Sequence, residues 1–200
     1  MTIGFSVQGS TDRALLHGLR TRWCPNAGLI QGPFRGSTQE SLRREYRKIC
    51  EQFVEQNVEV MVFLTDADTE PWREVQRNER SRFPAEHLPH AVHGVADRNV
   101  ECWICADPQW LARELGAGPE QFQCENPKRA FERVLGISRD DSKEAEIAAL
   151  VSKAPLHRWL IEPSFEDLYE QLRDQSQQLG CCVENLRDSG AASRRPDGGS

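Results

Sequence analysis

The feature that most constrains the fold is the run Val58–Leu64, which is nearly continuous in β-branched and apolar residues. A strand with one face in water would alternate polar and apolar residues. A continuous run of this length instead predicts a strand buried on both faces, as in parallel sheets covered by helices. The run leads directly into Thr65-Asp66-Ala67-Asp68. The sequence therefore predicts an α/β fold with a pair of acidic residues at the end of a central strand.

The N-terminal half alternates strand and helix patterns around this central run. Further strand patterns fall at 2–7, 27–34 and 90–96, and helix patterns at 11–22, at 37–56, from Glu70 onward, and at 99–116 with a break at Pro108. A capping-box pattern at Ser37–Glu40 starts the second helix, and Pro33 places the second strand at an edge. Strand–helix–strand crossovers predict parallel pairing. We expect a Rossmann-like three-layer α/β fold with a mainly parallel four-stranded sheet.

The chain divides into three expected parts. Residues 1–116 form the α/β domain. Residues 117–186 form a helical C-terminal extension packed on it, with helix patterns near 126–136, 142–153 and 164–179. The tail 187–200 is rich in small and polar residues, so we expect it to be disordered. Asp107 precedes Pro108 and is a candidate cap for the helix that begins there.

Composition and charge limit the cellular compartment and the binding partners that we expect for this chain. The net charge of −6 argues against a broad basic surface that binds nucleic acid by counterion release, so any nucleic-acid contact should be local. No stretch approaches the roughly 18 apolar residues of a membrane span, and the start lacks the pattern of a signal peptide. The seven cysteines are odd in number and scattered, unlike a secreted disulfide framework. We expect a soluble, cytoplasmic protein without membrane association; the sequence leaves open whether it is an oligomer.

The acidic pair is the strongest candidate for chemistry. Asp66 and Asp68 are two residues apart at a strand end, so their carboxylates should project to one side and converge on one cation. Mg²⁺ or Mn²⁺ suits this pattern, because Mg²⁺ takes one or two carboxylates and leaves positions for water and phosphate oxygens. In parallel sheets, ligands bind beyond the carboxyl ends of the strands. The alternative is a pair of solvated loop acids.

Two other enzyme classes use a D-x-D pair after a strand. A haloacid-dehalogenase-type phosphatase needs Thr or Val two positions after the second Asp, and this chain has Glu70 there. That class is therefore a poor fit. A nucleotide-sugar transferase stays a rival, although so short a chain shows no separate acceptor domain.

Three motifs in order resemble the Toprim domain. They are Val7–Asp12 after the first strand, Leu64–Asp68 after a later strand, and Val100–Asp107, which resembles the E-x-W-x-x-A-D segment of a standalone Toprim-like family. Toprim domains occur in topoisomerases, primases, OLD-family nucleases and small proteins of bacterial defence loci. The resemblance covers residues 1–136. It implies a metal-dependent nuclease or nuclease-like effector acting on DNA or RNA, in an antiphage defence complex with an ATPase partner.

The resemblance also implies roles for single residues. Asp66 and Asp68 would hold the metal ion, with Glu101 in the first turn of a helix as a third acid. Gly9 would let the backbone approach a phosphate, although a tight turn is the simpler reason for a glycine. The family has a Glu as general acid or base where this chain has Gln8, which cannot exchange a proton near neutral pH. Either Asp12, Glu101 or a metal-bound water replaces it, or the chain is a catalytically degenerate scaffold that binds without cutting.

A basic stripe follows the acidic pair. Arg73, Arg77 and Arg80 recur at helical spacing, so they share one helix face. Beside a metal site, guanidinium groups can bind the phosphates of a nucleic-acid backbone. The alternative is an ordinary solvated helix face.

Overall fold

The computed structural model describes residues 1–32, 39–123, 126–138, 141–179, 181 and 183–188. Its sheet has four strands, β1 (Thr2–Ser6), β2 (Gly28–Gln31), β3 (Val60–Asp66) and β4 (Ala91–Ala96). All neighbouring strands are parallel, in the order β2-β1-β3-β4. The predicted α/β class with a parallel four-stranded sheet is confirmed. The end of the expected second strand, the start of the capping box and residues 189–200 of the tail lie outside the described residues.

Helices fill the connections and the C-terminal region. They are α1 (Ser10–Trp23), α2 (Gln39–Glu55), α3 (Trp72–Arg82), α4 (Val100–Ile104), α5 (Pro108–Leu115), α6 (Pro127–Leu135), α7 (Glu144–Lys153), α8 (Leu156–Trp159) and α9 (Pro163–Leu179), with 3₁₀ turns η1 (Ala85–His90) and η2 (Pro119–Gln121). In the part of the chain that is described, no helix has the length and apolar character needed to cross a membrane.

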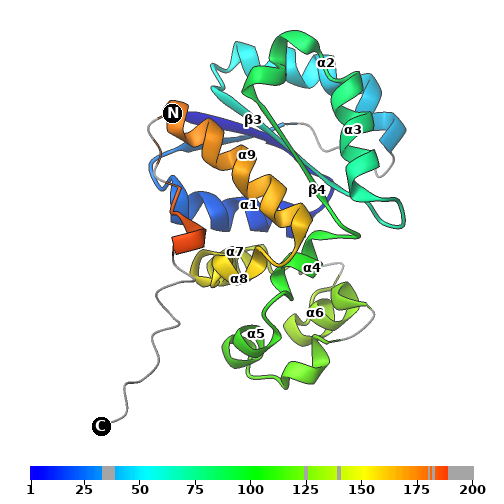
Figure 1. Cartoon of the computed structure of the whole chain (residues 1–200), viewed down its shortest axis with the longest axis vertical. Coiled ribbons are helices and arrows are strands. Elements are labelled where there is room, and N and C mark those ends of the chain that lie inside the picture. The colour runs from blue at the N-terminus through cyan, green and yellow to red at the C-terminus, as the bar shows by residue number, and fades with distance from the viewer. Residues whose placement is uncertain (33–38, 124–125, 139–140, 180, 182, 189–200) are drawn as a thin grey trace.

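The sheet is covered on both faces, as the central run predicted. Alternate residues of β3 point to opposite sides, with Val60, Val62 and Leu64 in one hydrophobic cluster and Met61 and Phe63 in another. The first cluster includes side chains of α1 and α9, and the second includes side chains of α2. Figure 1 shows the resulting three layers, with α2 and α3 on one side of the sheet and α1 and α9 on the other.

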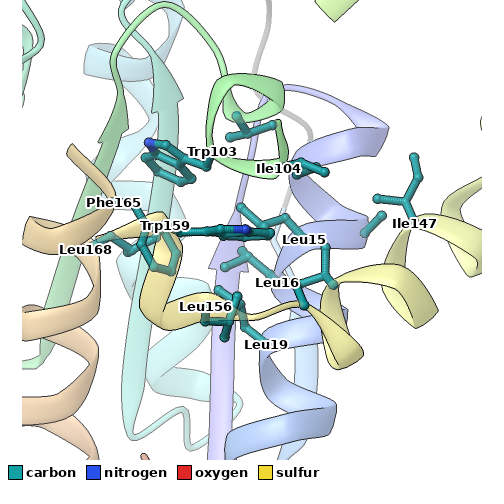
Figure 2. Close-up of a cluster of buried hydrophobic side chains, with 14 of the residues drawn as sticks. Leu15, Leu16, Leu19, Trp103, Ile104, Ile147, Leu156, Trp159, Phe165 and Leu168 are labelled. Atoms are coloured by element: carbon teal, nitrogen blue, oxygen red, sulfur yellow. The ribbon is translucent and has the colours of Figure 1, made fainter. Parts of the chain in front are cut away.

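The helices after residue 135 share the core of the α/β layers. Trp159 of α8 is fully buried, and its ring centroid lies 5.2 Å from that of Phe165 in α9. Figure 2 shows Trp159 in the middle of a cluster that includes Leu15 and Leu16 of α1 and Trp103 of α4. Truncating a buried Trp to Ala usually costs about 3–5 kcal/mol. This part of the chain therefore contributes directly to the stability of the fold.

A glycine allows α7 to approach α1 closely. A Cβ atom built on Gly18 would lie 2.6 Å from Val151 Cβ and 2.7 Å from the carbonyl oxygen of Ala148. No side chain fits there without moving the backbone of α7. The contact fixes the C-terminal helices against the first helix of the sheet domain.

Side-chain amides cover part of the exposed edge of β4. The backbone N–H of His93 donates to Gln171 Oε1 at 3.0 Å, and its carbonyl accepts from Gln171 Nε2 and Gln76 Nε2. Both amide nitrogens also donate to Asp167 Oδ2. The bridge satisfies the backbone groups that an edge strand leaves unpaired, and it joins α3 to α9.

Candidate functional site

Three carboxyl groups meet beyond the carboxyl ends of β1 and β3. Asp66 is the last residue of β3, Asp12 lies in the first turn of α1, and Glu101 lies in the first turn of α4. Parallel pairing puts the ends of β1, β3 and β4 at one edge of the sheet, which brings the helices that follow them together. Figure 1 shows α4 and α6 beyond this edge. We refer to Asp12, Asp66 and Glu101 as the acidic cluster.

Asp12 closes the turn between β1 and α1. Its Oδ2 accepts hydrogen bonds from the backbone N–H groups of Gln8, at 3.1 Å, and Gly9, at 2.8 Å. The side chain is only 3% exposed. Burial is the main cause that raises the pKa of Asp12 to about 6; the bond from Gly9 opposes this rise and the charge of Glu101 adds to it. The two N–H groups hold the carboxyl group in place, but burial disfavours its ionised form.

The carboxyl group of Asp66 is the most strongly perturbed in the cluster. Burial is the largest cause, followed by the charges of Asp12 and Glu101, and together they raise the pKa of Asp66 to about 8. Asp66 Oδ1 is buried and has no hydrogen-bond partner among the described residues. Without a compensating cation, Asp66 therefore carries a proton near neutral pH.

Glu101 is in a similar position. Burial raises its pKa, while Lys128 and a hydrogen bond from the Thr11 side chain act in the opposite direction. Glu101 Oε2 is also buried without a partner among the described residues. Two carboxyl oxygens from different elements are thus left without donors. Buried polar atoms are normally satisfied, so this pair marks a place where a cation or water would be stabilised.

Lys128 of α6 supplies a positive charge to the cluster. Burial tends to lower its pKa, but the carboxyl groups of Glu101 and Asp66 outweigh this effect and raise it. Lys128 therefore stays charged and offsets part of the acidic charge. No local pattern around Lys128 differs from an ordinary helix start, so its sequence surroundings in the C-terminal helical region do not reveal this role.

Asp66 and Asp68 have different surroundings. Strand geometry ends at Asp66, and Asp68 is exposed with its backbone in the left-handed region at φ 52°. Its N–H donates to the carbonyl oxygen of Arg98 at 2.9 Å. Asp68 is nevertheless near enough for its charge to raise the pKa of Asp66 slightly. It therefore lies at the rim of the acidic cluster.

The three acids predicted as metal ligands, Asp66, Asp68 and Glu101, are not preassembled around a common point. Within the described ranges, no three His, Cys, Asp or Glu side chains are already arranged to hold a metal ion. A cation here would be held by one or two carboxylates with water completing its coordination, which is the usual arrangement for Mg²⁺. The buried oxygens of Asp66 and Glu101 fit that role.

Gln8 and Gly9 lie next to the cluster. Gln8 Oε1 accepts a hydrogen bond from the backbone N–H of Asp66 at 3.1 Å. Gly9 is the N-cap of α1 in an extended conformation, and a Cβ atom there would make only an ordinary contact of 3.6 Å with Asp12 Oδ2. The fold alone therefore does not require glycine at position 9.

The basic stripe lies on the outer face of α3. Arg73, Arg77 and Arg80 are exposed and line an open hollow with Trp72 and Asp167. The guanidinium carbon of Arg73 lies 4.7 Å from the centroid of the Trp72 ring. None of the three arginines forms an ion pair with a described acid. Because α3 runs back from the carboxyl end of the sheet, Arg73 is nearest that end and Arg80 is farthest from it.

Comparisons with protein-family models, curated proteins and solved structures found no match to this chain. The fold and the acidic cluster are therefore the features that define the class of this protein. It is an α/β protein with a Rossmann-like three-layer fold, and its one concentration of perturbed carboxyl groups in the described residues lies at the carboxyl edge of its sheet.

Proposed function

We propose that this chain is a Toprim-like, divalent-metal-dependent protein that acts on phosphodiester bonds of DNA or RNA. The observation that carries the proposal is the pair of buried carboxyl oxygens, Asp66 Oδ1 and Glu101 Oε2, that have no hydrogen-bond partner among the described residues. They come from the two positions that the motif order singles out as acids of the site. Asp66 and Glu101 would hold Mg²⁺ or Mn²⁺, and Asp68 at the rim would bind its water ligands.

The residues around the cluster suit a phosphodiester substrate. A bound divalent ion would supply a Lewis acid for the phosphoryl oxygens and lower the pKa of bound water. The charged ammonium of Lys128 would attract a phosphate to the same place. The arginines of the α3 stripe would bind phosphates farther along the bound nucleic-acid strand, without making the whole protein surface basic.

The setting of this activity follows the Toprim resemblance. We propose that the protein works in the cytoplasm on nucleic acid, as part of an antiphage defence complex with an ATPase protein. An adjacent ATPase gene in the genome and co-purification of its product with this chain would support that partner.

A second candidate function is a non-catalytic Toprim-like binding module. Gln8 favours it, because the amide stands where the family has its proton-transferring Glu and is hydrogen-bonded to the backbone of Asp66. Such a module would still bind divalent ions and nucleic acid. Cleavage assays on the wild-type chain and its Gln8 variants distinguish the two functions.

Calorimetric titration with Mg²⁺ and Mn²⁺ tests the metal site. We expect weak binding by the wild type, with proton release near neutral pH because Asp66 must lose its proton. The double substitution Asp66→Asn/Glu101→Gln should abolish the binding. The exposed pair Glu114→Gln/Glu120→Gln is the matched control and should titrate like the wild type. Equal titrations of the wild type and the Asp66/Glu101 variant would overturn the metal site.

A further inference from the structure

Two neighbouring open hollows lie beside the acidic cluster. The first, of about 530 Å³, is lined by Asp68, Thr69, Asn99 and Asn126, among others. The second, of about 420 Å³, is lined by Cys102, Phe122, Ile161 and Glu162, among others. Both include Asp97, Arg98 and Pro127. The two hollows are therefore neighbours, the first beginning at the rim acid Asp68 and the second lying between α4 and the turn after α8.

Arg98 stands where the two hollows meet, on a strained turn. Its φ is 68°, and the N–H of Asn99 donates to the carbonyl oxygen of Asp97 at 3.1 Å, which closes a three-residue turn around Arg98. A left-handed backbone is unfavourable for an arginine. Strain of this kind persists only where surrounding contacts impose it, and it concentrates at functional sites.

The surrounding contacts that impose this turn can be identified. The carbonyl of Arg98 accepts from Asp68 N–H at 2.9 Å, and Asp97 N–H donates to Ser164 Oγ at 3.1 Å. The turn is therefore bonded to the loop after β3 on one side and to the start of α9 on the other. The Arg98 side chain is exposed on this fixed base. The geometry holds Arg98 on a fixed base in the lining of both hollows.

The second hollow has a mixed lining, with apolar side chains and the carboxyl groups of Glu162 and Asp97. Phe122 and Cys105 are buried in its wall, and Ile161 at its rim is 74% exposed, the most exposed large apolar side chain of the described residues. Glu162 and Asp97 supply the acidic side. Burial, with the charge of Asp97 nearby, raises the pKa of Glu162. A ligand that fits here has flat apolar faces and hydrogen-bond donors on its edge.

We propose that the second hollow binds one unpaired nucleobase that carries an amino group, while Arg98 binds the phosphate next to it. The inference rests on the proposed function and names its substrate as single-stranded nucleic acid. An unpaired base can leave its stack and pack against the exposed side chain of Ile161, which a base inside a duplex cannot do. The carboxyl oxygens of Glu162 and Asp97 accept bonds from the amino group of cytosine, adenine or guanine. Thymine and uracil have no amino group, and their single edge donor, the ring N3–H, lies between two carbonyl oxygens that carboxylates repel.

Fluorescence anisotropy with labelled oligonucleotides of about eight nucleotides tests the subsite. In Mg²⁺, we expect the wild type to bind oligo(dC) about fivefold or more tightly than oligo(dT), as expected for one specific edge contact. Ile161→Asp should weaken oligo(dC) binding about fivefold and leave the Mg²⁺ titration unchanged. Glu162→Gln should reduce the preference to less than about twofold, because an amide can pair with either edge.

Val54→Asp is the matched control, because Val54 is the other exposed large apolar side chain among the described residues and is 52% exposed near the C-terminal end of α2. It should bind both oligonucleotides like the wild type. Mg²⁺-dependent binding that shows no base preference and is unaffected by Ile161→Asp would overturn the subsite and leave the proposed function intact. Tighter binding of a duplex than of either single strand would also overturn it. No Mg²⁺-dependent binding of any oligonucleotide would overturn the subsite together with the proposed function.

Discussion

The side-chain oxygen of Gln8 accepts a hydrogen bond from the backbone N–H of Asp66 at 3.1 Å. This bond ties the turn after β1 to the last residue of β3, across two strands that are already paired in parallel. It fixes an amide beside the acidic cluster, at the position to which the proposed Toprim likeness assigns a carboxylate. A Glu side chain at this position can accept the same bond, so the substitution changes chemistry with little change in packing.

Gln8→Glu should therefore raise nuclease activity at least about tenfold, because positioned acid–base groups contribute about 10²–10⁴ in rate. The wild-type chain alone should cleave weakly or not at all. The measurement is cleavage of labelled DNA and RNA with Mg²⁺ or Mn²⁺, with and without the ATPase partner. Gln8→Ala, which removes the bond to Asp66, serves as the control and should stay inactive.

Two results would contradict this prediction in different ways. Robust wild-type cleavage that depends on Asp66 but does not increase with Gln8→Glu would show that Asp12 or Glu101 already transfers the proton. No cleavage by either form, with or without the partner, would favour the non-catalytic module.

The stability of the metal-free chain should depend on the proton of Asp66. Its pKa is raised from 3.8 to about 8, so the folded state binds this proton more tightly than the unfolded state. The resulting stabilisation is complete below about pH 4 and is lost as the pH rises through about 8. Asp66→Asn mimics the protonated form. Near pH 9, without metal ions, the variant should therefore be more stable than the wild type by about 1 kcal/mol or more.

Urea denaturation in a chelating buffer at about pH 5 and about pH 9 measures this effect. The difference between the two proteins should shrink at the lower pH, where Asp66 is already protonated in the wild type. Added Mg²⁺ should stabilise the wild type alone, because only its cluster binds the ion. A variant that is less stable than the wild type near pH 9 would show that the Asp66 charge is well compensated.

The basic stripe should contribute to nucleic-acid affinity. Replacing Arg73, Arg77 and Arg80 by Ala should weaken binding and flatten its salt dependence, each lost phosphate contact reducing the slope by about 0.7–0.9. Binding measured over a series of salt concentrations gives the slope. A control variant removes three exposed basic residues outside α3: Lys48, Arg113 and Lys153. Equal slopes for the two variants would show that the stripe is an ordinary solvated helix face that does not contact nucleic acid.

Ser164 should stabilise both the core and the turn of Arg98. Its hydroxyl oxygen accepts from the buried Trp103 Nε1 at 2.8 Å and from Asp97 N–H at 3.1 Å. Ser164→Ala leaves a buried indole N–H unsatisfied, which should cost about 1–3 kcal/mol of unfolding free energy. Urea denaturation measures the loss. Ser152→Ala, whose hydroxyl bonds only within its own helix, should change stability much less, and equal losses would contradict the assignment.

Local patterns in the sequence were sufficient to predict the sheet and most of the helices. The continuous apolar run before Asp66 required burial on both faces, and β3 indeed contributes to both hydrophobic clusters. Asp107 caps α5 as expected, because its side chain accepts from Trp110 N–H at 3.1 Å and Pro108 takes the first helical position. Periodicity, capping residues and proline act over a few neighbouring residues, so the sequence displays them directly.

The placement of Asp66, Gln8 and Glu101 at one edge of the sheet also followed from the sequence, through motif order and parallel topology. The short helix α8, which carries Trp159 into the core, did not, because four residues show no periodicity. Its position is decided by long-range packing against α1 and α9.

The chemistry of the acidic cluster was decided by tertiary structure alone. The raised pKa of Asp66, the ammonium of Lys128 beside it and the hollow that Arg98 lines all depend on segments far apart in the chain. Burial and the distances between charges are properties of the folded chain. The sequence specified which residues carry charge, and the fold determined which of those charges act on one another.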